Sequence, residues 1–282
     1  MTNMDLSALL SVCAPRAIPD LSLPTDLKIL ILAPHPDDFD AIGVTLKHLS
    51  DNGNPIYVAI ARTGSGVEDA YRPGVTLAQK ADLREDEQRQ SLDFFGLPEH
   101  CITFLLLSND REDQPLDNSE NNAAILTLIR KEALDIVFLP HGNDTNSGHR
   151  AMYSLFSQAA RRLGRSLVAF LNRDPKTIGM RTDLYMPFGR AEADWKAQLL
   201  RFHDSQHQRN LRTRGHGFDD RILDVNLKIA RDLSLAHEYA EAFEVEIHDN
   251  PEQRIPTNES NTTSSSPRAA NSKRLIRHVG EH

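Results

Sequence analysis

The sequence predicts an α/β fold: a mostly parallel sheet with helices on both faces, plus a smaller mixed C-terminal part. Short apolar runs recur from Leu27 onward and have the length of buried strands. Longer, polar-rich segments with helical spacing lie between them, and strands that alternate with helices are typical of βαβ units. Turn-forming residues separate the two kinds of segment, as at Asn52-Gly53-Asn54-Pro55 and Gly96-Leu97-Pro98.

Each expected element follows from these patterns. The strands expected in the parallel part are Leu27–Ala33, Ile56–Ala61, Ile102–Leu107, Asp135–Pro140 and the weaker Ser166–Leu171. The helices expected between them are Asp40–Ser50, Ala78–Phe95, Asn121–Ala133 and His149–Leu163. In the C-terminal part, the patterns favour helices at Arg190–His203 and Asp219–Leu235, and a late strand at Ala240–Ile247.

The composition changes near the C-terminus. From Asn250 onward the chain is rich in Ser, Thr, Asn and Pro, and it has almost no aliphatic residue before Leu275. Such a segment cannot bury enough apolar surface to offset its ordering entropy. We therefore expect an N-terminal extension over residues 1–26, one domain over residues 27–249 and a disordered tail over residues 250–282.

Charge and composition exclude several classes of protein. A net charge of −8 argues against a broad nucleic-acid-binding surface. No apolar stretch approaches the roughly 18 residues of a membrane helix, and the N-terminus lacks the basic region of a secretory signal. Two cysteines, Cys13 and Cys101, do not indicate a disulfide framework. We expect a cytoplasmic protein that binds neither nucleic acid nor membrane; homo-oligomerisation is left open.

A polar tetrapeptide, His35-Pro36-Asp37-Asp38, directly follows the first expected strand. In an open α/β sheet, ligands bind at this edge. His35 and Asp38 can reach one metal ion, and catalytic zinc usually has three protein ligands. A third ligand can come from the loop after Asp135–Pro140, where both His141 and His149 are candidates. The sequence therefore suggests a metal site shared by two strand ends.

Asp37 has a separate expected role, because neighbouring residues rarely bind the same ion. A carboxylate beside a metal-activated water can accept its proton and later donate a proton to a leaving amine. The same tetrapeptide is also typical of a helix start, since Asp is a favoured N-cap and Pro suits the first turn. That structural alternative remains open on these residues alone.

Six ordered motifs resemble the PIG-L/LmbE-like zinc-dependent N-deacetylases. They are Ala33–Asp38 with Gly43, Thr63-Gly64, Arg84 with Glu87 ahead of Phe95-Gly96-Leu97, Asn143–Arg150, His203–Gln206 and Tyr239–Phe243. The resemblance implies a Rossmann-like fold and an LmbE-like deacetylase domain over residues 27–249. It also implies removal of an acetyl group from an N-acetylated amino sugar or a related amide.

The resemblance also implies roles for individual residues. His35, Asp38 and His149 match the family's zinc ligands, and Asp37 matches its general base. Arg84 matches a substrate contact, although Arg84 and Glu87 could equally form an exposed helical pair. His203 falls in a motif that lines the site, and we expect it to bind substrate; the alternative is that it only packs in the core or caps a helix. The expected cofactor is Zn²⁺, with iron or nickel left open by the ligand types.

Three positions depart from the family pattern. Phe39 replaces the Glu that usually follows the tetrapeptide, so we expect altered substrate contacts or packing. Asn146 occupies the place of a His that stabilises the oxyanion, and we expect its amide to donate a hydrogen bond there. Gly148 replaces the Asp before the last His, so support for His149 must come from elsewhere. Asp144 is our candidate for that support and for a contact with substrate.

The leading functional hypothesis is a metal-dependent amide hydrolase acting on a small N-acetylated, amino-sugar-like substrate. The alternative is a module of the same fold that binds metal or ligand but is catalytically impaired, as the departures at Asn146 and Gly148 suggest. The retained Asp37 argues against it, because a binding module needs no base. A nucleotide-binding Rossmann domain is disfavoured, since no Gly-x-Gly-x-x-Gly follows the first strand.

Overall fold

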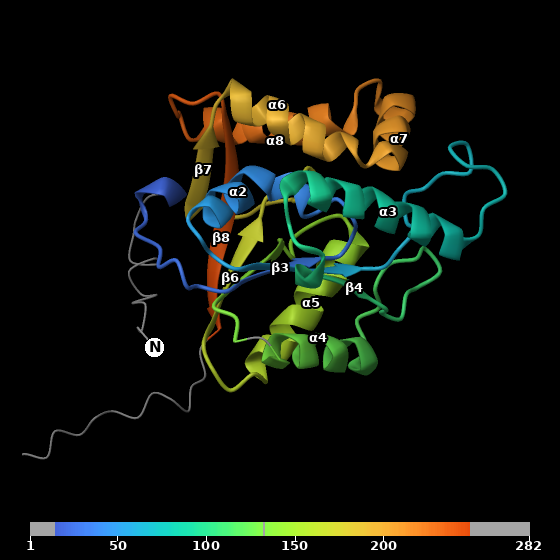
Figure 1. The fold of residues 1–282 in the computed structure, drawn as a ribbon, viewed down its shortest axis with the longest axis horizontal. Helices are drawn as coiled ribbons and strands as arrows, with labels where there is room; N and C mark the ends of the chain where they lie inside the picture. Colours follow the sequence, from blue (N-terminus) through green and yellow to red (C-terminus); the bar gives the residue numbers. More distant parts are fainter. Residues whose placement is uncertain (1–14, 132, 249–282) are drawn as a thin grey trace, which may run out of the picture. The chain divides into compact units, whose positions relative to one another are not determined.

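The computed structural model describes residues 15–131 and 133–248, and Figure 1 shows their arrangement. A single sheet lies between helices on both faces, so the predicted α/β class with a mostly parallel sheet is confirmed. The expected disordered tail over residues 250–282 and most of the N-terminal extension lie outside the described residues. The proposed domain limits therefore remain predictions.

Strand β2 sits inside the sheet at the point where the strand order reverses. The strands are β1 (Arg16–Ala17), β2 (Ile29–Ala33), β3 (Ile56–Ala61), β4 (Ile102–Leu105), β5 (Ile136–Pro140), β6 (Leu167–Asn172), β7 (Leu184–Phe188) and β8 (Tyr239–His248). Their spatial order is β1-β7-β8-β6-β5-β2-β3-β4, and only β8 runs antiparallel to its neighbours. The chain runs from β2 toward β3 and β4 on one side, whereas β5 pairs with β2 on the other. Ligands of open α/β sheets bind at such a switch point.

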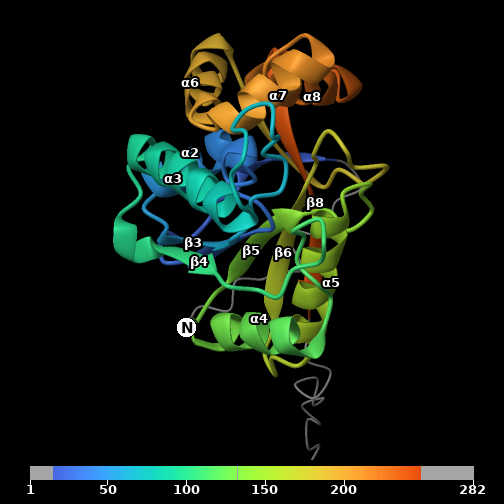
Figure 2. The same ribbon diagram turned by 90° about the vertical axis from the view of Figure 1, so that its right-hand side faces the viewer.

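Helices cover both faces of the sheet. They are α2 (Gly43–Asp51), α3 (Leu77–Phe95), α4 (Ser119–Lys131), α5 (Ser147–Arg161), α6 (Arg190–Arg201), α7 (Asp204–Arg214) and α8 (Phe218–Asp232), with short 3-10 turns η1 (Ile18–Asp20), η2 (Asp40–Ile42) and η3 (Glu99–Cys101). Helices α4 and α5 lie on one face and α2 and α3 on the other (Figure 2). Helices α6, α7 and α8 lie together at the C-terminal part, where α8 packs against β8. Among the described residues, no helix is long and apolar enough to cross a membrane.

The central strand shows why the parallel strands read as continuous apolar runs. Ile29 and Ile31 belong to the core on the α2 and α3 face, and Leu30 and Leu32 belong to the core against α4 and α5. A strand that is buried on both faces has no polar positions to alternate with. This core holds the end of β2, and therefore the polar tetrapeptide, in a fixed place.

The C-terminal part contains two elements that the sequence patterns did not predict. Strand β7 includes Pro187, which weakens the strand pattern, yet its partner β8 pairs with it along the whole length of β7. Helix α7 carries only Leu211 as an aliphatic residue, so it lacks the apolar periodicity that marks a packed helix. The expected helix Arg190–His203 ends at Arg201, and His203 precedes α7 as its N-cap residue.

Candidate metal centre and active site

The loop after β2 folds back on itself around Asp38. Its Oδ2 accepts a hydrogen bond from the backbone N–H of His35 at 2.8 Å and lies 3.2 Å from His35 Nδ1. Both side chains are buried. The loop therefore presents one imidazole nitrogen and one carboxylate side by side, at the edge where the sequence analysis expected them.

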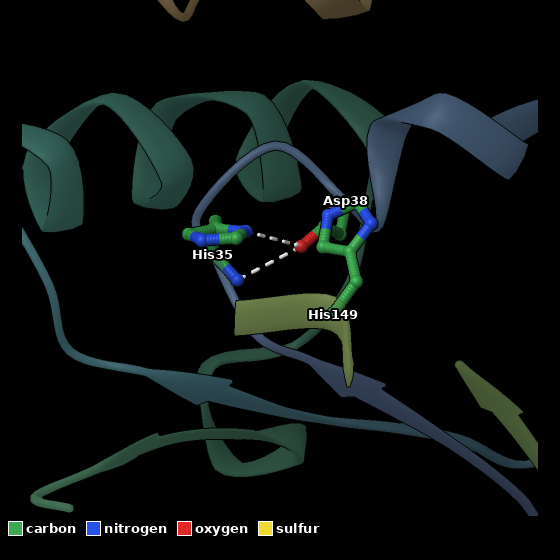
Figure 3. Close-up of side chains that lie close together, drawn as sticks. All are labelled: His35, Asp38 and His149. Carbon is green, nitrogen blue, oxygen red and sulfur yellow. Dashed lines mark hydrogen bonds and ion pairs between the residues drawn. The ribbon is translucent and has the colours of Figure 1, made fainter. Parts of the chain in front are cut away.

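His149 reaches the same carboxylate from the first turn of α5. Its Nε2 lies 3.3 Å from Asp38 Oδ1. The helix begins there because the Asn146 side chain accepts a hydrogen bond from the N–H of Gly148 at 2.9 Å, as an N-cap does. One donor atom each from His35, Asp38 and His149 lies within 4.8 Å of the others, and Figure 3 shows Asp38 between the two rings. We call these three side chains the HDH cluster.

The second nitrogen of each imidazole is held by an acceptor. His35 Nε2 lies 2.7 Å from Gln114 Oε1, and His149 Nδ1 lies 3.2 Å from Asp144 Oδ2. Each acceptor fixes a tautomer whose other nitrogen, bearing a lone pair, faces Asp38. Two oriented imidazoles and one carboxylate are the donor set of a catalytic zinc site, so the HDH cluster fits the metal that the sequence analysis expected.

The charges around the HDH cluster also suit a cation. Burial alone would raise the pKa of Asp38, but His149 and His35 outweigh it and hold that pKa well below its usual range. Burial alone would lower the pKa of His149, whereas Asp38 and Asp144 raise it well above its ordinary value. A third acidic group, Asp174, lies 4.0 Å from His149 Nδ1. Positive charge is therefore stabilised at this position.

His141 does not join the HDH cluster. This resolves the choice between His141 and His149, the two candidate ligands that follow β5. Its Nδ1 accepts a hydrogen bond from the N–H of Asn143, and its Nε2 lies 3.4 Å from Glu244. Its ring stacks on Tyr153. His141 therefore organises the loop away from the cluster.

Asp37 has a backbone conformation that L-amino acids rarely adopt, with φ of 115°. The backbone N–H of Asp37 donates to Gln88 Oε1 at 2.9 Å, and Asp37 Oδ2 lies 2.9 Å from Arg84 Nη2. Such strain persists only where surrounding contacts enforce it, and it concentrates at functional sites. No hydrogen bond from the described residues reaches Oδ1, which leaves that oxygen free for a water.

This strain yields a testable difference between two variants. Asp37→Gly and Asp37→Ala both remove the carboxylate, but only glycine adopts this φ without steric cost. In urea denaturation, we expect the free energy of unfolding of Asp37→Gly to exceed that of Asp37→Ala by about 1 kcal/mol. Equal stabilities, or a more stable alanine variant, would show that the loop is unstrained.

Arg84 and Glu87 do not form the exposed helical pair that the sequence alone allowed. Both are buried, and each bonds away from the other. Arg84 Nη1 donates to the carbonyl of Ser65 at 2.7 Å and Nη2 also contacts the carbonyl of Pro36, while Glu87 accepts two hydrogen bonds from Ser205. Arg84 lines the cavity described below, where its observed contact is the side chain of Asp37.

His203 lies behind the tetrapeptide loop. Its side chain is fully buried, and Nε2 lies 2.5 Å from Asp40 Oδ2. Asp40 in turn accepts a hydrogen bond from Gln88, whose side-chain oxygen accepts a hydrogen bond from the N–H of Asp37. These contacts fit a role in fixing the loop, whereas the contact with substrate that we expected from His203 would need it in the cavity wall. Gln88 itself gave no signal in the sequence.

Asp144 is likewise buried behind the HDH cluster, with 1% of its surface exposed. Besides His149, it accepts a hydrogen bond from the N–H of Asn146 at 2.6 Å and one from Thr177. Of the two roles expected for Asp144, support of His149 matches these contacts and substrate binding does not.

The departures from the family pattern have local packing reasons. Phe39 is fully buried and packs edge-on against Phe95, so the packing alternative fits and a substrate contact does not. At Gly148, a Cβ atom would lie 2.7 Å from His35 Nε2 and closer still to Gln114 Oε1. Glycine at this position thus makes room for Gln114, a residue that the sequence analysis missed in the long loop before α4.

Gly148→Ala should therefore weaken metal binding. The added methyl group displaces Gln114 from His35, and lost outer hydrogen bonds typically cost about 10–100-fold in metal affinity. Competition with a chelating dye measures the zinc Kd. Gly179→Ala, where the nearest atom would be 3.7 Å away, is the matched control. An unchanged Kd in Gly148→Ala would contradict the assigned contact.

A cavity of about 420 Å³ opens above the HDH cluster. Asp37 and Asn146 line it together with the cluster, and Asp174 and Gln114 complete this part of its wall. Half of the remaining lining residues belong to α7 and the start of α8. Its size and concave form suit a small-molecule substrate.

Residues 30–160 match the family model described as PIG-L: GlcNAc-PI de-N-acetylase. The resemblance stated from the sequence motifs is thereby confirmed, and the match spans the HDH cluster and Asp37. No curated protein matches the sequence.

Solved structures share the fold of this chain. The N,N'-diacetylchitobiose deacetylase from Pyrococcus horikoshii is 19% identical with a TM-score of 0.64, over 78% of this chain and 83% of its own. The zinc-inhibited form of teicoplanin deacetylase Orf2 is 17% identical with a TM-score of 0.57, over 79% and 99%. GalB, the 4-carboxy-2-hydroxymuconate hydratase of Pseudomonas putida KT2440, is 16% identical with a TM-score of 0.59, over 78% and 95%. At such identities the likeness concerns the fold alone.

Proposed function

We propose that this protein is a metal-dependent amide hydrolase that removes the N-acetyl group of a small, amino-sugar-like substrate. One observation carries the proposal: Asp37, whose backbone is strained, lines the same cavity as a donor set suited to zinc. The PIG-L match and the deacetylases among the structures of similar fold support the same reaction.

In this proposal His35, Asp38 and His149 hold the metal. A bound divalent ion would polarise the amide carbonyl and lower the pKa of water at the site. Gln114 and Asp144 keep the two imidazoles oriented, so the donor atoms need little rearrangement. Zn²⁺ is our first choice, because neutral imidazole with one carboxylate is a frequent catalytic zinc set.

Asp37 acts as the general base and then as the general acid. Its Oδ1 accepts the proton of the attacking water, while Arg84 holds Oδ2 in place. After attack, Asp37 donates that proton to the departing amine. The Asn146 amide, at the cavity wall, donates a hydrogen bond to the carbonyl oxygen as negative charge develops on it.

An impaired binding module is not favoured, because the strained base and the oriented donor set are both present. The test combines metal analysis of the purified protein with acetate release from a panel of N-acetyl amino sugars and N-acetylated peptides. We expect about one zinc ion per chain and acetate from the sugars. A metal-loaded protein that releases no acetate from any amide would refute the hydrolase.

A further inference from the structure

Three arginines line the part of the cavity that is formed by α7 and α8. They are Arg209 and Arg214 of α7 and Arg221 of α8, and we call them the arginine wall. Lys176, from the loop after β6, also lines the cavity. Neither the proposed metal nor the proposed base requires these cations, and a chain with a net charge of −8 does not place them here by composition.

Carboxylates compensate the arginine wall only in part. Among residues 15–131 and 133–248, no carboxylate oxygen lies within 4.0 Å of a side-chain nitrogen of Arg214, Arg221 or Lys176, although Asp37 and Asp174 line the same cavity. Arg209 approaches Glu68 at 3.8 Å, but Glu68 is bound more closely by Arg212, which is not one of the residues that line the cavity. Arg214 donates from Nε to Asn210, a neutral partner.

The cationic groups are close enough to repel one another. Burial lowers the pKa of Arg221; Arg214 and Arg209 lower it further, whereas Asp174 and Asp37 act in the opposite direction. Like charges that line one cavity repel one another, and an anion that enters the cavity relieves this repulsion. Guanidinium groups bind carboxylate and phosphate oxygens through two parallel hydrogen bonds, which lysine cannot match.

We propose that the arginine wall binds an oxyanion substituent, phosphate or carboxylate, of the amide substrate. This inference rests on the proposed function and narrows it to acidic N-acetyl amino sugars. The anionic group contacts Arg214 and Arg221 while the N-acetyl group lies at the HDH cluster, within the same cavity. Three polar side chains of α7 that also line the cavity, Gln206, Asn210 and Thr213, offer hydrogen bonds to sugar hydroxyls.

The experiment compares kcat/KM for a neutral substrate and two acidic ones. The neutral substrate is N-acetylglucosamine, the phosphate arm is N-acetylglucosamine 6-phosphate, and the carboxylate arm is N-acetylmuramic acid. In the wild type we expect at least one acidic substrate to exceed the neutral one by about tenfold or more, the scale of charge-assisted hydrogen bonds. The arm with the larger ratio identifies the oxyanion.

The ratio of kcat/KM for the acidic substrate to kcat/KM for the neutral one should fall by about tenfold in Arg221→Gln and in Arg214→Gln. Arg231→Gln makes the same change on α8 at an exposed position outside the cavity lining, and it should leave the ratio unchanged. A wild-type ratio near one for both acids would overturn the proposal. So would equal losses on acidic and neutral substrates, because these indicate a structural effect.

Binding of inorganic phosphate separates failure of this inference from failure of the hydrolase. Calorimetric titration of the metal-loaded protein should detect phosphate binding that Arg221→Gln weakens and Arg231→Gln preserves. If no amide is hydrolysed but this pattern holds, the hydrolase proposal fails and the anion site stands. Phosphate binding that is absent, or equal in both variants, rejects the anion site.

Discussion

Asp37→Asn is expected to lower kcat by about 10²–10⁴-fold, the usual contribution of a positioned general base. Asparagine has the size of aspartate and tolerates positive φ, so the backbone conformation at this position can persist. The amide oxygen can still accept a hydrogen bond from Arg84, but the side chain no longer accepts a proton from water. Acetate release under saturating substrate measures the loss.

Metal content distinguishes this loss from a damaged site. Because Asp37 is not one of the three clustered donors, the variant should retain the wild-type amount of zinc. Asp93→Asn makes the same change at an exposed position of α3 and should keep full activity. Asp37→Asn that hydrolyses the substrate at the wild-type rate would remove Asp37 from the mechanism.

Asp38→Asn is expected to abolish stable metal binding. Asp38 is the one carboxylate between the two imidazoles, and its negative charge is what the cluster offers a divalent cation. A ligand that binds only the folded state at 100 times its Kd stabilises by about 2.7 kcal/mol. For a domain of this size that corresponds to a rise in Tm of about 5–10 °C. The wild type should show this rise on adding zinc, and Asp38→Asn should not.

The matched control for the metal experiment is His100→Ala, which removes an exposed imidazole in η3. It should show the same zinc-induced rise as the wild type and the same metal content by mass spectrometry. A comparable rise in Asp38→Asn would mean that zinc binds somewhere other than the HDH cluster.

Local patterns were sufficient to predict much of the sheet and half of the metal centre. The apolar run Leu27–Ala33 predicted a buried strand, which the structure shows at Ile29–Ala33, and the end of such a strand locates His35 and Asp38 at the ligand-binding edge. His149 required more than its own pattern, because His141 was an equal candidate until the family resemblance and then the contacts with Asp38 separated them.

Other parts of the candidate site depend on contacts between residues far apart in the chain. His35 and Gln114 are 79 residues apart, and Asp37 and Gln88 are 51 apart. Glutamines in a loop or a polar helix show no periodicity that reveals their partners. The left-handed backbone of Asp37 was equally hidden, since Asp has no general preference for that conformation strong enough to predict it.

The sequence by itself determined the α/β class, the strand ends that carry the tetrapeptide and the distal loop, and the residue types available for a metal. Short-range hydrophobic periodicity and the order of the motifs along the chain predict these features. Only the tertiary structure decided which acceptor orients each imidazole, where Asp37 is held by Arg84, and that α7 and α8 bring arginines to the same cavity. The physical reason is that these properties arise from the packing of distant segments against a common sheet edge, and no local pattern encodes that packing.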